Sequence, residues 1–326
     1  MSFGNIIQKF GISGKMKSYR LITKGHINQT YLIKMEDGRA YILQRVNSHA
    51  LQCPEQIMQN IVKVTDYLRK HYPHVQTLHF YQTENGKSLL DNWRIMDKIQ
   101  GVTLANTDNL KAVESMGYAF GEFHQMLTDF PVSELYHTFP EFHNTRKRFS
   151  SLWKAVERNH FSRASLIADE LQQLHEYENP ACLLVDGLEM KKFPMRVLHG
   201  DMKCSNILLN PNDFKPIAVI DLDTLMMGTV LTDYGDAVRS LMGTEFHIEK
   251  YQAFERGYLQ SALFLTENEK EYLIPSAFCM TIELATRYAE DYLNNDIYFH
   301  ADSLKRLREL LSSAENFKDF VHKIRF

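Results

Sequence analysis

The sequence predicts an α+β protein with two lobes: a small N-terminal lobe with an antiparallel sheet and one main helix, and a large, mostly helical C-terminal lobe. Three observations lead to this fold class. Short segments rich in β-branched, aromatic and aliphatic residues occupy most of the chain before Gly101. Helical patterns dominate after it. One strand–loop–strand island, at 196–223, interrupts those helical patterns.

The N-terminal lobe is expected to contain several strands and one helix. A hairpin turn is predicted at 36–38, where Glu, Asp and Gly separate two strand candidates. Pro54 suits the first position of a helix, and apolar residues recur at helical spacing from Ile57 to Leu68, so 54–70 is predicted to be an amphipathic helix. The strand candidates are 19–23, 30–34, 40–46, 77–83 and 93–99.

The C-terminal lobe is expected to be helical outside its island of strands, with one long helix broken near Pro275. We place the N-terminal lobe at 1–97, a hinge at 98–104 and the C-terminal lobe at 105–326. Ligands often bind in the cleft between two such lobes. The predicted helices are 109–127, 145–159, 163–177, 245–263, 267–294 and 303–324.

Composition argues against several classes of protein. The 326 residues carry 37 Lys and Arg against 40 Asp and Glu, a formal charge of −3, whereas a nucleic-acid binder needs a basic excess to neutralise phosphates. No apolar run approaches the roughly 18 residues of a membrane span or forms the core of a secretion signal. The four cysteines are scattered without a CxxC pair, which argues against a zinc site or a disulfide framework. We therefore expect a cytoplasmic protein with no nucleic-acid or membrane partner. The sequence leaves its oligomeric state open, and we favour a monomer.

Polar residues gather where the apolar runs of the island end. The runs 207–209 and 217–220 are predicted to form a hairpin across 210–213, and that hairpin would bring Asn206 close to Asp221. Amide and carboxylate oxygens suit a hard cation such as Mg²⁺, which completes its shell with water and nucleotide phosphates.

Two more residues of the island complete the parts of a phosphoryl-transfer site. Asp201, five residues before Asn206, could accept a proton from a hydroxyl nucleophile, and Lys203 could reach a phosphate oxygen. The alternative is a surface turn in which Asp and Asn side chains bind backbone amides. The combined spacing of the four residues 201, 203, 206 and 221 favours phosphoryl transfer.

The motif Asp–x–x–x–x–Asn followed by a metal-binding Asp is the kinase catalytic-loop pattern. His199-Gly200-Asp201 and Ile220-Asp221-Leu222-Asp223 resemble the aminoglycoside phosphotransferase and choline kinase superfamily rather than protein kinases. With the segments 41–47, 142–148, 234–239 and 283–299, the chain resembles the N-acetylhexosamine 1-kinases of that superfamily from about residue 23 to 299. The resemblance implies a bilobal, protein-kinase-like fold, ATP as co-substrate and Mg²⁺ as cofactor.

The resemblance also implies roles for the island. Asp201 is expected to be the catalytic base that orients the sugar hydroxyl, while Lys203 keeps the role given above, contact with a phosphate oxygen. Asn206 and Asp221 are expected to bind Mg²⁺, and Asp223 to bind a second metal ion. The expected nucleotide contacts are Gly25, Asn28 and Thr30 in the loop over the phosphates, Arg45 on the third strand with Gln44 as the alternative, and the backbone at Met96 and Ile99.

The acceptor implied is N-acetylglucosamine or N-acetylgalactosamine, phosphorylated on the C1 hydroxyl to give the sugar 1-phosphate. Besides Asp201, the expected contacts to the sugar are Arg287, Tyr288, His143 and Arg148. For Arg287 the alternative is a surface salt bridge to Asp291, four residues on.

Three polar residues are expected to be structural. His199 is expected to hold the catalytic loop through hydrogen bonds, Asp236 to brace that loop, and His124 to be a packed core histidine. Two functional alternatives remain. One is a kinase of the same superfamily for choline, an aminoglycoside, methylthioribose or homoserine. The other is a non-catalytic nucleotide-binding scaffold.

Overall fold

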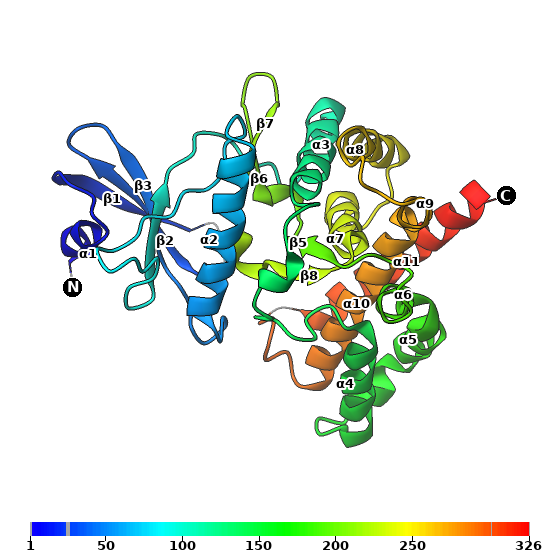
Figure 1. Cartoon of the computed structure of the whole chain (residues 1–326). Coiled ribbons are helices and arrows are strands. Elements are labelled where there is room, and N and C mark those ends of the chain that lie inside the picture. Colours follow the sequence, from blue (N-terminus) through cyan, green and yellow to red (C-terminus); the bar gives the residue numbers. More distant parts are fainter. Residues whose placement is uncertain (1, 24–26, 301, 326) are drawn as a thin grey trace.

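The computed structural model describes residues 2–23, 27–300 and 302–325. A sheet with the helices α1 and α2 beside it forms one part, and a larger helical part adjoins it (Figure 1). This confirms the predicted fold class. The elements are α1 (Phe3–Lys9), β1 (Met16–Ile22), β2 (Gln29–Met35), β3 (Ala40–Arg45), α2 (Pro54–His71), β4 (Trp93–Asp97), α3 (Leu110–Met126), α4 (Thr145–Arg158), α5 (Ala168–Ala181), α6 (Leu183–Glu189), β5 (Arg196–Leu198), β6 (Ile207–Leu209), β7 (Pro216–Val219), β8 (Met226–Gly228), α7 (Val230–Met242), α8 (Ile248–Ser261), α9 (Glu267–Glu271), α10 (Leu273–Leu293) and α11 (Ser303–Arg325), with 3₁₀ turns η1 (Val132–Glu134), η2 (Ala164–Ile167), η3 (Cys204–Asn206) and η4 (Leu222–Thr224).

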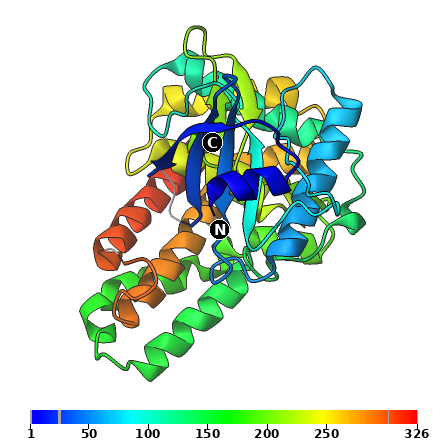
Figure 2. The same cartoon turned by 90° about the vertical axis from the view of Figure 1, so that its left-hand side faces the viewer.

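The N-terminal sheet is antiparallel, with the strand order β1-β2-β3-β4. Alternation along the strands points Ile33, Leu43 and Ile95 to one face, where they are buried with Ile6 of α1 and with Phe10, which follows that helix. Figure 2 shows α1 lying across this face. The opposite face of the sheet is therefore the one turned to α2 and the helical part.

Helix α2 begins at Pro54 as predicted and buries Ile57, Ile61 and Val64. It packs against the turn η4 of the helical part, so it joins the two parts of the molecule. The helix α1 was not predicted, because its seven residues are too few to show a helical period.

The predicted strand at 77–83 is wrong. That segment makes an isolated bridge from Phe80 to Met96, and Tyr81 N–H donates to the Ile95 carbonyl. It therefore runs beside β4 without the continuous ladder that makes a strand.

The helical part is built around α10, which packs against α4, α5, α7 and α11. The predicted helix at 163–177 is displaced, since a 3₁₀ turn precedes α5. The predicted break near Pro275 is confirmed and falls at Tyr272, between α9 and α10. The helix α7 was missed because Asp233, Gly235 and Asp236 interrupt its apolar pattern. The short helix α6 was also not predicted.

The predicted hairpin is confirmed, since β6 and β7 pair antiparallel with Ile207 opposite Val219. Val102, within the expected hinge, exchanges both backbone hydrogen bonds with Leu209 at 2.9 Å. The hinge therefore pairs with β6 at one edge of the hairpin. The lobe boundaries given above stay a prediction. Within the described ranges no helix is long and apolar enough to cross a membrane.

Candidate active site

The catalytic loop follows β5 and begins with a sharp turn at Gly200. Its φ is +79°, and a Cβ there would lie 2.3 Å from the Thr224 carbonyl oxygen, so only glycine fits. The His199 ring lies 2.9 Å from the Ile220 carbonyl through Nε2 and accepts from Asp201 N–H through Nδ1. This pattern fits a neutral ring protonated on Nε2, which holds the loop as predicted.

Asp233, in the first turn of α7, holds the catalytic loop in place through hydrogen bonds. Its buried carboxylate accepts from the N–H groups of His199 and Gly200 at 2.6 and 2.9 Å. His124, in the core, also binds it, at 2.9 Å. Burial opposes ionisation, yet these hydrogen bonds hold the pKa of Asp233 below its ordinary value. Asp233 thus has the role expected of Asp236.

Asp236 instead binds Arg239 on its own helix, at 2.6 and 3.0 Å. The expectation for Asp236 was therefore misplaced by one helical turn. An acidic residue just after the start of α7 also accepts backbone N–H groups more readily, because the helix N-terminus favours negative charge.

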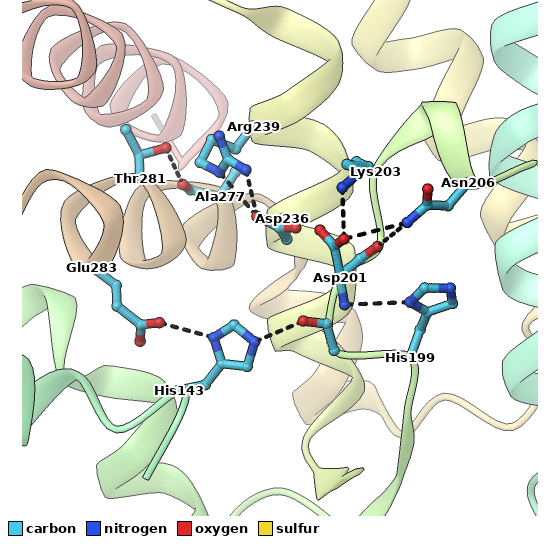
Figure 3. A network of polar contacts seen from close by, with 11 residues as sticks. His143, His199, Asp201, Lys203, Asn206, Asp236, Arg239, Ala277, Thr281 and Glu283 are labelled. Carbon is cyan, nitrogen blue, oxygen red and sulfur yellow. Dashed lines mark hydrogen bonds and ion pairs between the residues drawn. The ribbon is translucent and has the colours of Figure 1, made fainter. Parts of the chain in front are cut away.

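Asp201, Lys203 and Asn206 lie together in the loop (Figure 3). Lys203 Nζ is 2.6 Å from Asp201 Oδ2. Burial lowers the pKa of Lys203, but the Asp201 carboxylate outweighs it and the pKa is raised, so the ammonium stays charged. Asn206 donates through Nδ2 to the Asp201 carbonyl at 2.8 Å, which leaves its Oδ1 for another partner.

Asp221 follows the hairpin in a left-handed conformation, φ +65°. Ile220 N–H donates to the Asn206 carbonyl at 2.9 Å, so the hairpin brings Asp221 beside Asn206. Burial, and then the carboxylates of Asp223 and Asp201, raise the pKa of Asp221. Among the described residues no cation pairs with Asp221. A carboxylate without a counter-charge, next to a free amide oxygen, fits a divalent cation.

The described residues contain no cluster of three or more His, Cys, Asp or Glu that could hold a metal ion. A Mg²⁺ ion at this place would have Asn206 Oδ1 and Asp221 as its protein ligands. Water and phosphate oxygens would supply the others.

Asp223, expected to bind a second metal ion, is occupied by other groups. It is 7% exposed, and its carboxylate binds the guanidinium of Arg94 through both oxygens. Asn28 Nδ2 also donates to Asp223, at 2.6 Å. The structure thus places Asp223 in an ion pair between the two lobes.

The side chains of β3 alternate between the two faces of the sheet. Arg45 shares the α1-facing phase of Leu43, is exposed, and lies over the Trp93 ring at 5.9 Å. Gln44 points to the opposite face, where its Nε2 donates to Thr30 Oγ1 at 3.0 Å. The strand phase therefore favours the alternative, Gln44, over Arg45 as the residue that faces the cleft.

The other expected nucleotide contacts differ in how well their positions suit that role. Gly25 lies outside the described residues. Asn28 Oδ1 accepts from Asn47 N–H at 3.0 Å, so the end of its loop is fixed to the chain after β3. Met96 sits inside the sheet, opposite Ile42 of β3 and bridged to Phe80, whereas Ile99 is buried just beyond β4. The segment after β4 is thus better placed than Met96 to offer backbone groups to a base.

A cavity of about 1140 Å³ opens between α4, α10 and the 294–300 segment. Arg148 and Arg287 line it, together with Phe142, Tyr298 and Phe299. Asp201 is not among its lining residues. The cavity adjoins the catalytic loop through His143, which follows Phe142 and contacts the Gly200 carbonyl at 3.2 Å.

The cavity wall carries charges of both signs: Glu141, Glu290 and Asp291 line it as well as the two arginines. The Arg287 guanidinium carbon lies 5.5, 5.9 and 5.6 Å from the ring centres of Phe142, Tyr298 and Phe299. Burial, and then the charge of Arg287, lower the pKa of Arg148, and the buried Nε of Arg148 has no hydrogen-bond partner among the described residues. The cavity wall therefore offers N–H donors to a ligand that accepts hydrogen bonds.

One expected acceptor contact, Tyr288, does not line this cavity. Its ring stacks on Phe299 at 4.0 Å. The salt bridge from Arg287 to Asp291 does not form either. Asp291 instead accepts from the N–H groups of Tyr298 and Phe299, so it shapes the segment that carries these rings.

His143 supports the catalytic loop (Figure 3). Its Nδ1 lies 2.8 Å from Glu283 Oε1, and its Nε2 faces the Gly200 carbonyl. Both ring nitrogens face acceptors, so both carry hydrogens. Burial lowers the pKa of His143, but Glu283 outweighs that effect and the pKa is raised. Thr145 Oγ1 donates to the other oxygen of Glu283, at 2.7 Å.

Sequence reasoning missed three residues of the site: Arg94, Asp233 and Glu283. Arg94 carried a local signal, because it is an arginine inside an otherwise apolar strand pattern. Asp233 and Glu283 look like ordinary helix residues in the sequence. Their partners are distant along the chain, and only the fold shows them.

Comparisons with known proteins were consistent with this geometry. The sequence profile of the phosphotransferase enzyme family (APH) matches residues 18–272. That match includes the sheet, the catalytic loop and the hairpin, and it ends before the second half of the cavity wall.

Several solved structures share the fold. An aminoglycoside phosphotransferase from Alicyclobacillus acidocaldarius has 15% identity and a TM-score of 0.70, covering 98% of this chain and 94% of that one. An amicoumacin kinase in complex with AMP-PNP, Ca²⁺ and Ami has 13% identity and a TM-score of 0.67, covering 97% of this chain and 94% of that one. A choline kinase from Cryptosporidium parvum has 12% identity and a TM-score of 0.62, covering 94% and 90%.

Proposed function

This chain belongs to the phosphotransferase enzyme family, and from this premise we propose that it is an ATP-dependent kinase that phosphorylates the C1 hydroxyl of an N-acetylhexosamine. The strongest support is that one loop and one hairpin bring Asp201, Asn206 and Asp221 together. They lie beside a cavity whose lining includes arginines and aromatic rings. The coarser part of the proposal, a kinase for a small molecule, is supported by the family and by the shared fold.

Nucleotide-bound neighbours support ATP as the phosphoryl donor, because one of them was solved with AMP-PNP and Ca²⁺. In this chain Asn206 and Asp221 would hold the divalent cation against the phosphates. When bound, Mg²⁺ supplies charge neutralisation for the transferring phosphoryl group. Lys203 adds a fixed positive charge next to Asp201.

The chemical step needs little beyond placement. The sugar hydroxyl oxygen attacks the γ-phosphorus, the bond from that phosphorus to the β–γ bridging oxygen breaks, and ADP leaves with the electron pair. Asp201 orients the hydroxyl and accepts its proton. An anomeric hydroxyl is more acidic than an ordinary alcohol, so a well-placed carboxylate is sufficient to accept its proton.

The side of the cavity formed by Arg148 and Arg287, and not the side with Glu141, Glu290 and Asp291, supports a neutral acceptor with carbonyl and hydroxyl oxygens over a cationic one. Quaternary ammonium groups are recognised by aromatic cages, but here the faces of Phe142, Tyr298 and Phe299 already contact the guanidinium of Arg287. A second cation would also meet the charge of Arg148. An acetamido carbonyl and ring hydroxyls would instead accept from both arginines.

A substrate panel tests the proposal. ADP release is measured with ATP, Mg²⁺ and, in turn, N-acetylglucosamine, N-acetylgalactosamine, choline, an aminoglycoside, methylthioribose and homoserine. We expect turnover with the N-acetylhexosamines and background rates with the cationic compounds. Turnover with any other acceptor, and none with the hexosamines, would contradict the sugar assignment. ATP binding without turnover on any of them would indicate the scaffold alternative.

A further inference from the structure

Asp223 is a buried residue of the helical lobe that binds side chains of the N-terminal lobe. Its carboxylate receives three N–H donors, and all of them come from the N-terminal lobe. Arg94 Nη1 and Nη2 lie 2.5 and 2.9 Å from the two oxygens, and Asn28 Nδ2 lies 2.6 Å from Oδ2. Asp223 itself belongs to the turn η4, two residues beyond Asp221.

Arg94 is fixed from several other sides. Its Nε donates to Gln44 Oε1 at 2.9 Å, its Nη1 contacts Met58 Sδ at 3.4 Å, and its guanidinium lies 5.6 Å from the centre of the Phe80 ring. The Arg94 side chain is 3% exposed and that of Asp223 is 9% exposed. Arg94 cannot leave Asp223 without losing these contacts.

The three carboxylates Asp201, Asp221 and Asp223 therefore differ in their partners. Lys203 neutralises Asp201 and Arg94 neutralises Asp223, whereas Asp221 pairs with no cation in the described part of the chain. If Asp223 bound a metal ion, the ion would displace a buried guanidinium and leave it unpaired, which is strongly unfavourable.

We propose that Asp223 is a positioning residue and not a metal ligand. Through Arg94 it ties the turn that carries Asp221 to strand β4, and through Asn28 it ties that turn to the loop over the phosphates. This inference rests on the proposed function, because it presumes that Asp221 meets a nucleotide-bound cation. It predicts that the site binds nucleotide well only when the Arg94–Asp223 pair is intact.

The first test uses cysteine as a reporter of metal ligation. Asp221→Cys and Asp223→Cys are each titrated with Cd²⁺ in the presence of ADP, and the ultraviolet charge-transfer band of a cadmium thiolate is recorded against the wild type. We expect the band for D221C and no band for D223C. A band of similar strength in D223C would show that position 223 reaches the metal ion and would overturn the inference.

The second test separates positioning from mere stability. We expect D223N and Arg94→Met each to weaken Mg²⁺-dependent ADP binding by about 10- to 100-fold, with Arg94→Lys less affected because it keeps the positive charge. The double variant R94M/D223N leaves no unpaired buried charge and should bind ADP no more weakly than either single variant. Wild-type ADP affinity in R94M and D223N, measured below their unfolding transitions, would overturn the inference.

A matched control is available in the pair Arg196–Glu269. It is also bidentate and buried, with N–O distances of 3.1 and 3.2 Å, but it fixes β5 to α9. Arg196→Met should lower the melting temperature and leave ADP affinity unchanged. If the wild type itself bound no nucleotide, the proposed function would fail, whereas failure of this inference is seen only in the variants.

Discussion

Asp201 is the residue on which the proposed chemistry depends most directly. Its Oδ2 is paired with Lys203, and its backbone is fixed by His199 and Asn206. The loop therefore presents this carboxylate in one orientation before any substrate arrives. Such preorganisation is what lets placement replace strong acid–base chemistry in phosphoryl transfer.

We predict that Asp201→Asn lowers sugar-dependent ADP release by about 100-fold or more, because the amide cannot accept the hydroxyl proton. Nucleotide affinity should stay near that of the wild type, since Asn206 and Asp221 are untouched. Steady-state kinetics and ADP binding by calorimetry check the two halves. Full turnover in this variant would remove Asp201 from the mechanism.

The His143–Glu283 pair adds a pH-dependent contribution to stability. The pKa of His143 is raised and that of Glu283 is lowered in the folded protein. Stabilisation by the histidine is complete below its unfolded pKa of about 6.5 and is lost as the pH rises through the higher folded value. Stabilisation by the glutamate is lost only in acid, as the pH falls through its lowered folded value.

We therefore predict that His143→Gln melts well below the wild type near pH 6, because it leaves the buried Glu283 without its counter-charge. The difference in melting temperature should shrink as the pH rises above the folded pKa of His143. Thermal unfolding of both proteins over a series of pH values measures this. A difference that stays constant from acid to alkaline pH would show that His143 carries no charge here.

At the scale of elements, α3 and α8 approach so closely that their glycines are in backbone contact. A Cβ on Gly257 would lie 1.9 Å from the Glu114 carbonyl oxygen, and one on Gly117 would lie 2.0 Å from that of Phe254. The crossing of these helices positions His124 and, through it, Asp233 under the catalytic loop.

We predict that Gly257→Ala lowers the free energy of unfolding by about 3 kcal/mol or more, because backbone and not a flexible side chain must move. Gly4→Ala is the matched control, since Gly4 is also helical and has open space around its Cβ position. That variant should differ from the wild type by less than about 1 kcal/mol. Equal urea midpoints for the two variants would contradict the close contact.

The sequence could predict those elements whose signal is local. Strands β1 to β4 follow from segments rich in β-branched, aromatic and aliphatic residues, and helix α2 follows from helical spacing. The hairpin follows from two apolar runs around a turn. The helix α7 could not be predicted because its buried acid, Asp233, is satisfied by partners from two other segments. Asp201 and Asn206 lie five residues apart, so a local motif was enough to predict them. Arg94 binds Asp223, 129 residues away, so this pair becomes visible only in the fold.

At the scale of the whole molecule, the two lobes meet at the site instead of merely flanking it. The hinge residue Val102 pairs with Leu209, α2 packs on η4, and Arg94 binds Asp223. The catalytic loop belongs to the helical lobe, and most residues that line the cavity do too, although Ala50 and Gln52 of the N-terminal lobe also line it. Under the proposed function, nucleotide and acceptor would be held by different elements that meet at Asp201 and Asp221.

The most direct test of the account is the identity of the product. Phosphorus NMR is recorded on the mixture formed from ATP, Mg²⁺ and N-acetylglucosamine or N-acetylgalactosamine with the wild-type protein. We predict a sugar phosphate resonance coupled to the anomeric proton, formed in step with ADP, and its absence with Asp201→Asn. A phosphate on another hydroxyl, or ADP with inorganic phosphate alone, would contradict transfer to C1.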